Sequence, residues 1–80
     1  MDEWIDAFLH NIVWLRKHYQ LSKKSMAKLL HISVATLNQI ECGELPLGLT
    51  AEVTFYIYHC FGITVKDQFE LRLGADKMDA

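Results

Sequence analysis

The side chains most often used in catalysis or metal binding are scattered along this chain. They are four histidines and two cysteines: His10, His18, His31, His59, Cys42 and Cys60. They form no H-x-x-x-H pair, no C-x-x-C pair and no combined Cys/His ligand set of the kind that holds zinc. The sequence also lacks a glycine-rich phosphate loop and a G-x-S-x-G nucleophile motif. We therefore expect no enzyme activity, no metal and no cofactor.

The two cysteines lie 18 positions apart, at Cys42 and Cys60. The spacing alone leaves a disulfide between them open. Two buried or half-buried thiols in a reducing compartment are the expectation, because disulfides are rare in such compartments.

The other chemistry that the sequence suggests is the binding of a polyanion. The net charge of −2 is unevenly distributed: residues 1–10 carry −3, residues 11–43 carry +4 and residues 44–80 carry −3. The charges of the middle segment are those of Arg16, Lys17, Lys23, Lys24 and Lys28 against Glu41. A basic segment between two acidic ones is a weak sign of a nucleic-acid partner, and ordinary solvated lysines would give the same pattern.

Length and composition limit the class of protein. Eighty residues make one small domain, 1–80, with a core at about 4–70 and a tail at 71–80. With 51% hydrophobic and 22% charged residues, the chain is expected to fold. No apolar run approaches the length of a membrane span, and the acidic start differs from a signal peptide. We expect a soluble, cytoplasmic protein with no membrane contact.

These charged side chains must be positioned by helices, because apolar residues recur at steps of three and four almost throughout. The spacing predicts helices over 4–19, 23–30, 33–41, 50–61 and 64–70. On the first helix the inner face is Trp4/Ile5, Phe8, Ile12, Leu15 and Tyr19. The expected N-caps are Ser22, Ser33, Thr50 and Thr64, and the expected stops are Gly43 and Gly62.

The second and third predicted helices are separated by only about two residues. Their inner residues are Met26, Leu29, Leu30, Leu37 and Ile40. So short a connection makes the two helices cross steeply, which is a helix-turn-helix. The predicted fold class is all-α, a compact bundle of five short helices that contains this unit.

An ordered series of residues carries a resemblance to a known family. It reads Asn11-Ile12-x-x-Leu15-Arg16-Lys17, then LSKKSMAKLLHIS from Leu21 to Ser33, then Thr36-Leu37-Asn38-Gln39-Ile40-Glu41-x-Gly43, and later Phe61-Gly62-Ile63. The series covers about residues 8–70 and resembles the Cro/repressor-like, or XRE-type, helix-turn-helix family. The resemblance implies a lambda-repressor-like DNA-binding domain. Double-stranded DNA is then the expected partner, and transcriptional regulation the expected role.

The resemblance also implies roles for particular residues. The helix at about 33–41 becomes the recognition helix in the major groove, with outward positions Val34, Ala35, Asn38 and Gln39 over the bases. The expected phosphate contacts are Ser22, Lys23, Lys24, Lys28 and Ser33. Arg16 and Glu41 match the pair that joins the first and third helices, and we expect a partly buried structural ion pair. Ala27 falls where the two helices approach most closely.

The sequence departs from the family pattern at three places. His31 stands where many relatives have glycine, so it requires a left-handed backbone. Lys23 stands where many have glutamine. The loop after the recognition helix reads Glu44-Leu45-Pro46-Leu47, where a basic loop is usual. These departures keep an alternative open, in which the same fold is a protein-interaction module with weak or no DNA binding.

Apolar residues exceed the need of one small core. Phe55, Ile57, Tyr58 and Phe61 are expected in the core, whereas Trp4, Val13 and Trp14 are in excess. A second face is left over, and its residues are Val53, Tyr56, Cys60, Leu71 and Leu73. One interpretation is a homodimer built on this face of the fourth and fifth helices, which would bind a palindromic site. The other is that the first turn and the tail cover the excess within one chain.

Overall fold

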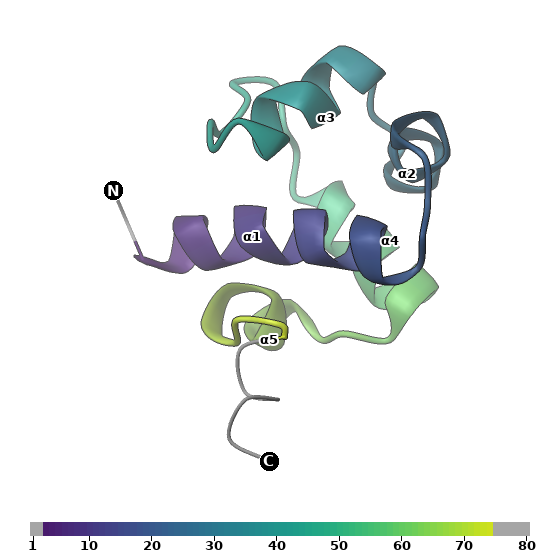
Figure 1. The fold of residues 1–80 in the computed structure, drawn as a ribbon. Helices are drawn as coiled ribbons and strands as arrows, with labels where there is room; N and C mark the ends of the chain where they lie inside the picture. Colours follow the sequence, from purple (N-terminus) through teal and green to yellow (C-terminus); the bar gives the residue numbers. More distant parts are fainter. Residues whose placement is uncertain (1–2, 75–80) are drawn as a thin grey trace.

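The computed structural model describes residues 3–74, and five α-helices account for most of them. They are α1 (Glu3–His18), α2 (Lys23–Leu30), α3 (Val34–Glu41), α4 (Glu52–Phe61) and α5 (Val65–Glu70) (Figure 1). Residues 3–74 contain no strand, so the prediction of an all-α bundle of five short helices is confirmed. Within the same range no helix is long and apolar enough to cross a membrane.

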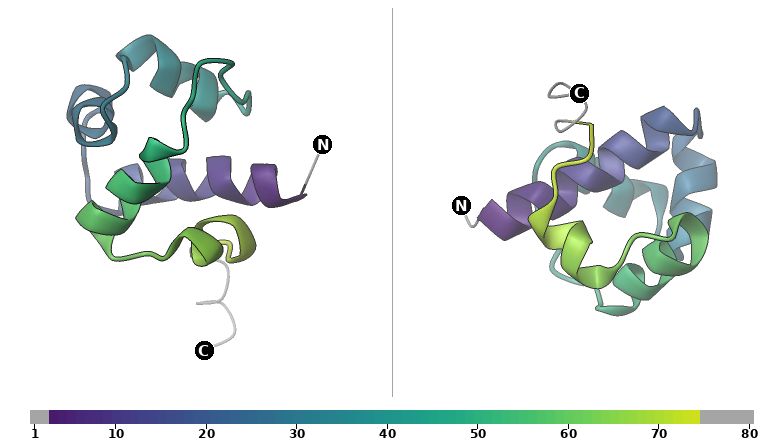
Figure 2. Two further views of the ribbon diagram at one scale, coloured as in Figure 1. Left: turned by 180° about the vertical axis from the view of Figure 1, so that it is seen from behind. Right: turned by 90° about the horizontal axis from the view of Figure 1, so that it is seen from below.

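The helices close a ring of contacts around the core. α1 packs against α3, α3 against α2, α2 against α4, α4 against α5, and α5 against α1 again. Figure 1 shows α1 across the middle with α2 and α3 above it and α5 below. Figure 2, seen from behind, shows α4 in front of α1. Each helix therefore buries one face against two neighbours.

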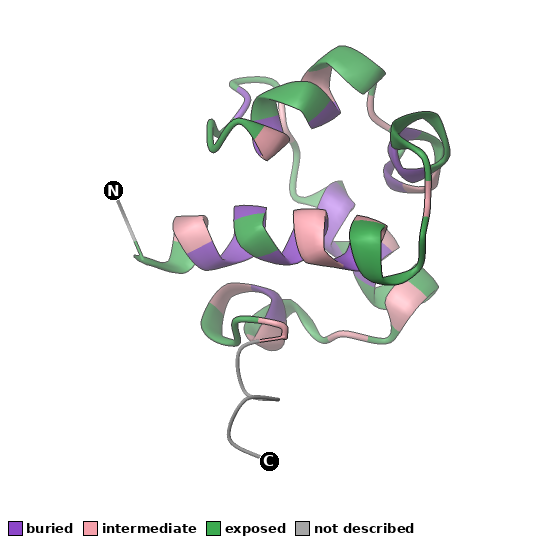
Figure 3. Ribbon diagram, in the orientation of Figure 1, coloured by how far each residue is buried: buried purple, intermediate pink, exposed green. Residues whose placement is uncertain are grey.

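The core is formed by the inward stripes of four helices (Figure 3). Its buried members are Phe8, Leu9, Ile12, Leu15, Met26, Ala27, Leu30, Leu37, Ile40, Val53 and Ile57. The prediction was wrong for the ends of the first stripe, since Trp4 and Tyr19 are exposed. Trp4 lies in the first turn of α1 and Tyr19 directly follows its last residue; α1 itself starts and ends one residue earlier than expected.

Side-chain caps begin three of the helices as predicted. The hydroxyls of Ser22, Ser33 and Thr64 each accept a backbone N–H three residues on. Thr50 is not the cap of α4: Ala51 occupies that position with a helical backbone, and no side chain caps it. The first turn of α4 is held instead by backbone bonds to the carbonyls of Thr50 and Ala51.

The structure and the prediction differ in which side of α4 is buried and which is exposed. Val53 is buried together with Ile57, which lies four residues further along the same face. Phe55 and Tyr58, expected in the core, are 63% and 54% exposed. Because α4 is apolar all round, only its contacts with α2 and α5 decide which side turns inward.

The prediction of buried or half-buried thiols was also wrong. Cys42 and Cys60 are both exposed and both free. Cys42 follows the last residue of α3, and Cys60 lies on the outer side of the last turn of α4.

A buried polar network attaches the C-terminal part of the described chain to α1. Asn11 Nδ2 donates to the carbonyl of Gln68 at 2.8 Å and to that of Leu71 at 2.6 Å, and its Oδ1 accepts the N–H of Leu73 at 2.8 Å. Gln68 Nε2 donates to the carbonyls of Thr54 and Ile63. These bonds satisfy main-chain groups that α5 and the segment after it would otherwise leave without partners.

Leu73 and Gly74 are consequently half-buried, although the whole stretch 71–80 was expected to be extended or frayed. Leu73 packs against the core, and its carbonyl lies 3.0 Å from His10 Nε2. Gly74 lies against the indole of Trp14, which is half-buried. The segment therefore covers part of the apolar excess of α1 within one chain; residues 75–80 lie outside the described range.

Candidate nucleic-acid interface

α2 and α3 are joined by three residues, 31–33. In Figure 1 α2 is seen nearly end-on while α3 lies across the view, so the two axes are steeply inclined. His31 ends α2 with φ 59° and ψ 41°, the left-handed backbone expected for this position. The N–H of Ile32 returns to the carbonyl of Ala27 at 3.0 Å, and Ala27 is buried at this approach.

The turn is also held by a side chain that glycine would lack. The ring of His31 stacks on that of Tyr56, with centroids 4.0 Å apart and an interplanar angle of 20°. Since Tyr56 belongs to α4, this contact ties the end of α2 to its other neighbour in the ring of helices. No local sequence pattern indicates a contact between two residues so far apart in the chain.

The outer face of α3 carries all four residues expected over the bases. Val34, Ala35, Asn38 and Gln39 are exposed, while Leu37 and Ile40 hold the opposite face in the core. Asn38 presents a carboxamide, whose paired donor and acceptor match the N6 and N7 of adenine. Gln39 lies at the edge of a hollow of about 520 Å³ between α3 and residues 46–50.

The two serines expected at phosphates are exposed, and both are already used by their own helices. Ser33 Oγ accepts the N–H of Thr36 at 3.0 Å and donates to Thr36 Oγ1 at 2.9 Å. Ser22 makes the same two bonds to Ser25. What the start of α2 offers an anion is therefore the main-chain N–H groups of Lys23 and Lys24, which have no acceptor within the helix.

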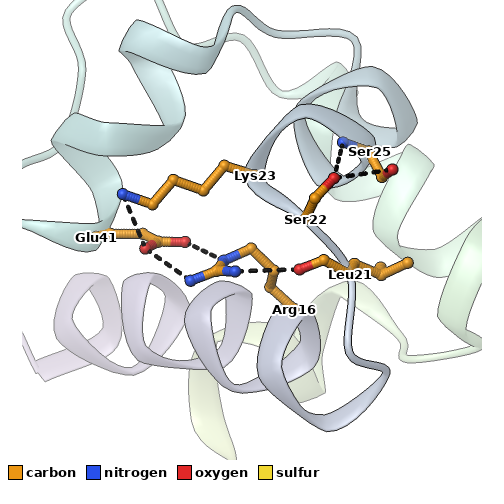
Figure 4. Close-up of polar contacts among 6 residues, drawn as sticks. All are labelled: Arg16, Leu21, Ser22, Lys23, Ser25 and Glu41. Carbon is orange, nitrogen blue, oxygen red and sulfur yellow. Dashed lines mark hydrogen bonds and ion pairs between the residues drawn. The ribbon is translucent and has the colours of Figure 1, made fainter.

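An ion pair fixes α3 against α1 (Figure 4). Arg16 Nε donates to Glu41 Oε2 at 2.5 Å, and its Nη2 donates to Oε1 at 3.2 Å. Arg16 Nη1 also donates to the carbonyl of Leu21 at 3.0 Å, which holds the chain entering α2. The two side chains are 17% and 13% exposed, so the pair is partly buried, as expected.

Lys23 shares this carboxylate, although it was expected at a phosphate. Its ammonium lies 3.9 Å from Glu41 Oε1, and Figure 4 shows its side chain extending towards Glu41. Arg16, Lys23 and Glu41 together leave one net positive charge at the junction of α1, α2 and α3. With 48% of its side chain exposed, Lys23 can still contribute to the field of this surface.

Lys24 and Lys28 lie four residues apart on one face of α2 and are both exposed. Neither has an ion-pair partner among residues 3–74. They are the freest cations beside α3, which itself carries no basic residue in its last turn.

The segment after α3 has the opposite character. Glu44 is exposed, and it follows Gly43, which has the expected left-handed backbone with φ 86°. Leu45 and Leu47 are exposed on either side of the buried Pro46. α3 is thus flanked by cations at α2 and by a carboxylate and leucines at its own end.

The residues expected to form a dimer face are not gathered on one surface. Val53 is buried in the core, so it is excluded from any interface between copies. Tyr56 is half-buried against His31, and Leu73 is half-buried against the core. Only Cys60 and Leu71 are exposed.

Residues 3–74 contain no group of three or more His, Cys, Asp or Glu side chains that could hold a metal ion. The arrangement on α2 and α3 is one of exposed hydrogen-bonding and cationic side chains on helices whose inner faces are buried, which suits recognition of a surface. No protein-family model, no curated protein and no solved structure matches the chain, so its function is inferred from its own residues.

Proposed function

We propose that the chain is a sequence-specific DNA-binding transcriptional regulator of XRE type. In this proposal α2 and α3 are its helix-turn-helix, and α3 lies in the major groove. The observation that carries the proposal is the outer face of α3, where Val34, Ala35 and Asn38 are exposed on a helix held rigidly by its buried side. Asn38 and Gln39 read adenine edges, and Val34 and Ala35 contact thymine methyl groups.

The positioning contacts come from α2. Lys24 and Lys28 neutralise phosphates on one side of the groove, while the N-terminal N–H groups of α2 donate to another phosphate. Each neutralised phosphate releases counterions, so the observed affinity falls with salt with a slope of about −0.9 per contact.

A single α3 of eight residues covers few base pairs, and we propose that two copies bind together. The described chain measures about 35 × 28 × 22 Å. Two such bodies side by side can place their α3 helices one turn of the duplex apart, about 34 Å. The expected site is therefore a palindrome.

One set of observations favours a second candidate function, a protein-interaction module that uses the same face. α3 exposes Val34, ends beside the carboxylate of Glu44 and has no basic residue in its last turn. An apolar protein contact would respond little to salt, whereas DNA binding would weaken steeply.

The test is selection from random duplexes with the purified protein at 50 and 200 mM salt, followed by affinity measurements on the enriched duplex. We expect a two-fold symmetric motif. Asn38→Ala should relax one base preference by about 1–3 kcal/mol. Lys24→Ala should weaken all sequences equally and reduce the salt slope by about 1. Lys66→Ala, an exposed lysine on α5, is the matched control and should change neither.

Two results would contradict the proposal. If folded protein enriches no duplex at either salt, the interaction module becomes the better account of the α3 face. If Asn38→Ala leaves the motif unchanged, α3 does not read bases through this residue.

A further inference from the structure

An apolar groove is lined by residues outside α2 and α3. Its walls come from the first half of α1, the segment 45–51, α4 and α5, and it encloses about 570 Å³. Thr50 and Thr54 are the polar residues among its walls. The view from below in Figure 2 shows α5 in front, with the first half of α1 and the segment leading into α4 beside it.

The groove is open to water along its rim. Phe8 and Phe69 form its floor, buried and half-buried. Four other large apolar side chains on its walls are exposed: Leu45, Leu47, Phe55 and Val65. A small-molecule pocket encloses most of its ligand, and walls this exposed do not. An extended apolar surface, such as one face of a helix, would cover them.

The charges around the groove narrow the choice of partner. Four carboxylates lie next to its walls in the sequence or in an adjoining hollow, Glu3, Glu44, Glu52 and Glu70, against two cations, Lys66 and Arg72. Glu44 and Glu52 immediately precede and follow the wall segment 45–51. Glu3, Glu70 and Arg72 line an adjoining hollow that shares Phe69 with the groove, so carboxylates outnumber the cation there as well. An apolar surface set among carboxylates is complementary to a partner that combines apolar and basic side chains.

A second copy of the chain does not have this combination. Two copies joined groove to groove would bring the same excess of carboxylates together. The basic stretch 11–43 of another copy exposes only Tyr19 and Val34 among its large apolar residues, so it offers no ridge to fill the groove.

We propose that this groove binds a basic amphipathic helix of a different protein. The apolar face of that helix, with side chains at i, i+3, i+4 and i+7, packs on Leu45, Phe55 and Val65. Its lysines or arginines lie against the surrounding carboxylates. The proposal does not rest on DNA binding, because it uses residues outside α2 and α3.

The probes are two fourteen-residue model helices with the same leucine face. In one peptide all the remaining positions are lysine, and in the other they are all glutamate. Binding to the full chain is measured by calorimetry at 50 and 200 mM salt. We expect the Leu/Lys peptide to bind at least tenfold more tightly than the Leu/Glu peptide, and more weakly at the higher salt.

Two substitutions on α4 provide a matched pair. Phe55 lies on the groove, whereas Tyr58 is similarly exposed and is not among its walls. Phe55→Ser should weaken binding of the Leu/Lys peptide at least tenfold, and Tyr58→Ser should leave the affinity for this peptide unchanged. Both side chains are exposed, so both variants are expected to fold, which circular dichroism checks.

Three results would overturn the proposal. The first is that neither peptide binds. The second is equal loss of affinity in the two variants, which would mean non-specific attraction to an acidic protein. The third is self-association of the wild-type chain that Phe55→Ser abolishes, which would assign the groove to a second copy.

Discussion

α1 is attached to its two neighbours in physically different ways. Towards α3 the attachment is the charged pair Arg16–Glu41, which water still reaches. Towards α5 it is the neutral amide of Asn11, which is buried and bonded only to main-chain groups of Gln68, Leu71 and Leu73. A partly buried charged pair that water still reaches can exchange its bonds for water, whereas a fully buried amide cannot.

The difference indicates which side of the molecule can adjust. Lys23 lies within reach of Glu41, so the carboxylate has a second cation available if Arg16 moves. On the other side each bond of Asn11 has one geometry, and losing it leaves a buried group without a partner. We expect the proposed DNA-binding side to tolerate change and the α5 side to be fixed.

The largest effect should follow removal of the buried amide. Asn11→Ala deletes three hydrogen bonds to main-chain groups and should lower the free energy of unfolding by about 3 kcal/mol, since each unpaired buried group costs about 1–3. Urea denaturation measures the loss, and hydrogen exchange at the Leu73 amide should accelerate.

Asn38→Ala is the control, because it removes an exposed amide of the same chemistry. Its effect on stability should stay within about 0.5 kcal/mol. Equal effects of the two substitutions would mean that the Asn11 network does not hold α5.

A smaller loss is expected on the charged side. Glu41→Gln keeps the shape and one acceptor but removes the charge that faces Arg16, and it should cost about 2 kcal/mol in urea denaturation. Glu44→Gln, an exposed carboxylate three residues on, should be neutral within about 0.5 kcal/mol. If Glu41→Gln lowers the free energy of unfolding more than Asn11→Ala does, the contact of α1 with α3 is the more strongly held of the two.

The smallest effect concerns the segment over α1. A Cβ on Gly74 would lie 2.2 Å from Trp14 Nε1, and the backbone there has φ +88°. Gly74→Ala should therefore lift this end of the segment at a cost of about 1 kcal/mol. The emission of Trp14, measured with Trp4 replaced by Phe, should shift to the red.

Gly48→Ala is the matched substitution, since a Cβ there meets nothing within 4 Å. It should change neither stability nor emission. An unchanged emission in Gly74→Ala would show that the indole does not pack on this segment in solution.

Much of the fold could be predicted from the sequence because local rules decide it. Helix spacing and the capping serines are read from neighbouring residues, and α2 has the expected bounds. The sides of α4 could not be predicted in the same way. Val53, Phe55 and Tyr58 are all apolar, so their burial depends on which neighbours α4 meets.

The buried network could not be predicted for another reason. Asn11 bonds carbonyl and N–H groups 57 to 62 residues away, and main-chain groups give no sequence signal for their partners. The nearness of Lys23 to Glu41 could not be predicted for a similar reason, since it depends on how α2 meets α3. The roles proposed for Asn38 and Lys24 remain predictions, because exposure permits them without testing them.

The same separation sets a timetable for folding during synthesis. α1 leaves the ribosome before α5, and Asn11 must wait for residues 68–73 before its bonds can form. At roughly 5–20 residues per second, an interval of about 60 residues lasts about 3–12 s. Throughout that time the face of α1 that packs against α5 is uncovered. A nascent chain halted before residue 68 would therefore be a substrate for chaperones and proteases.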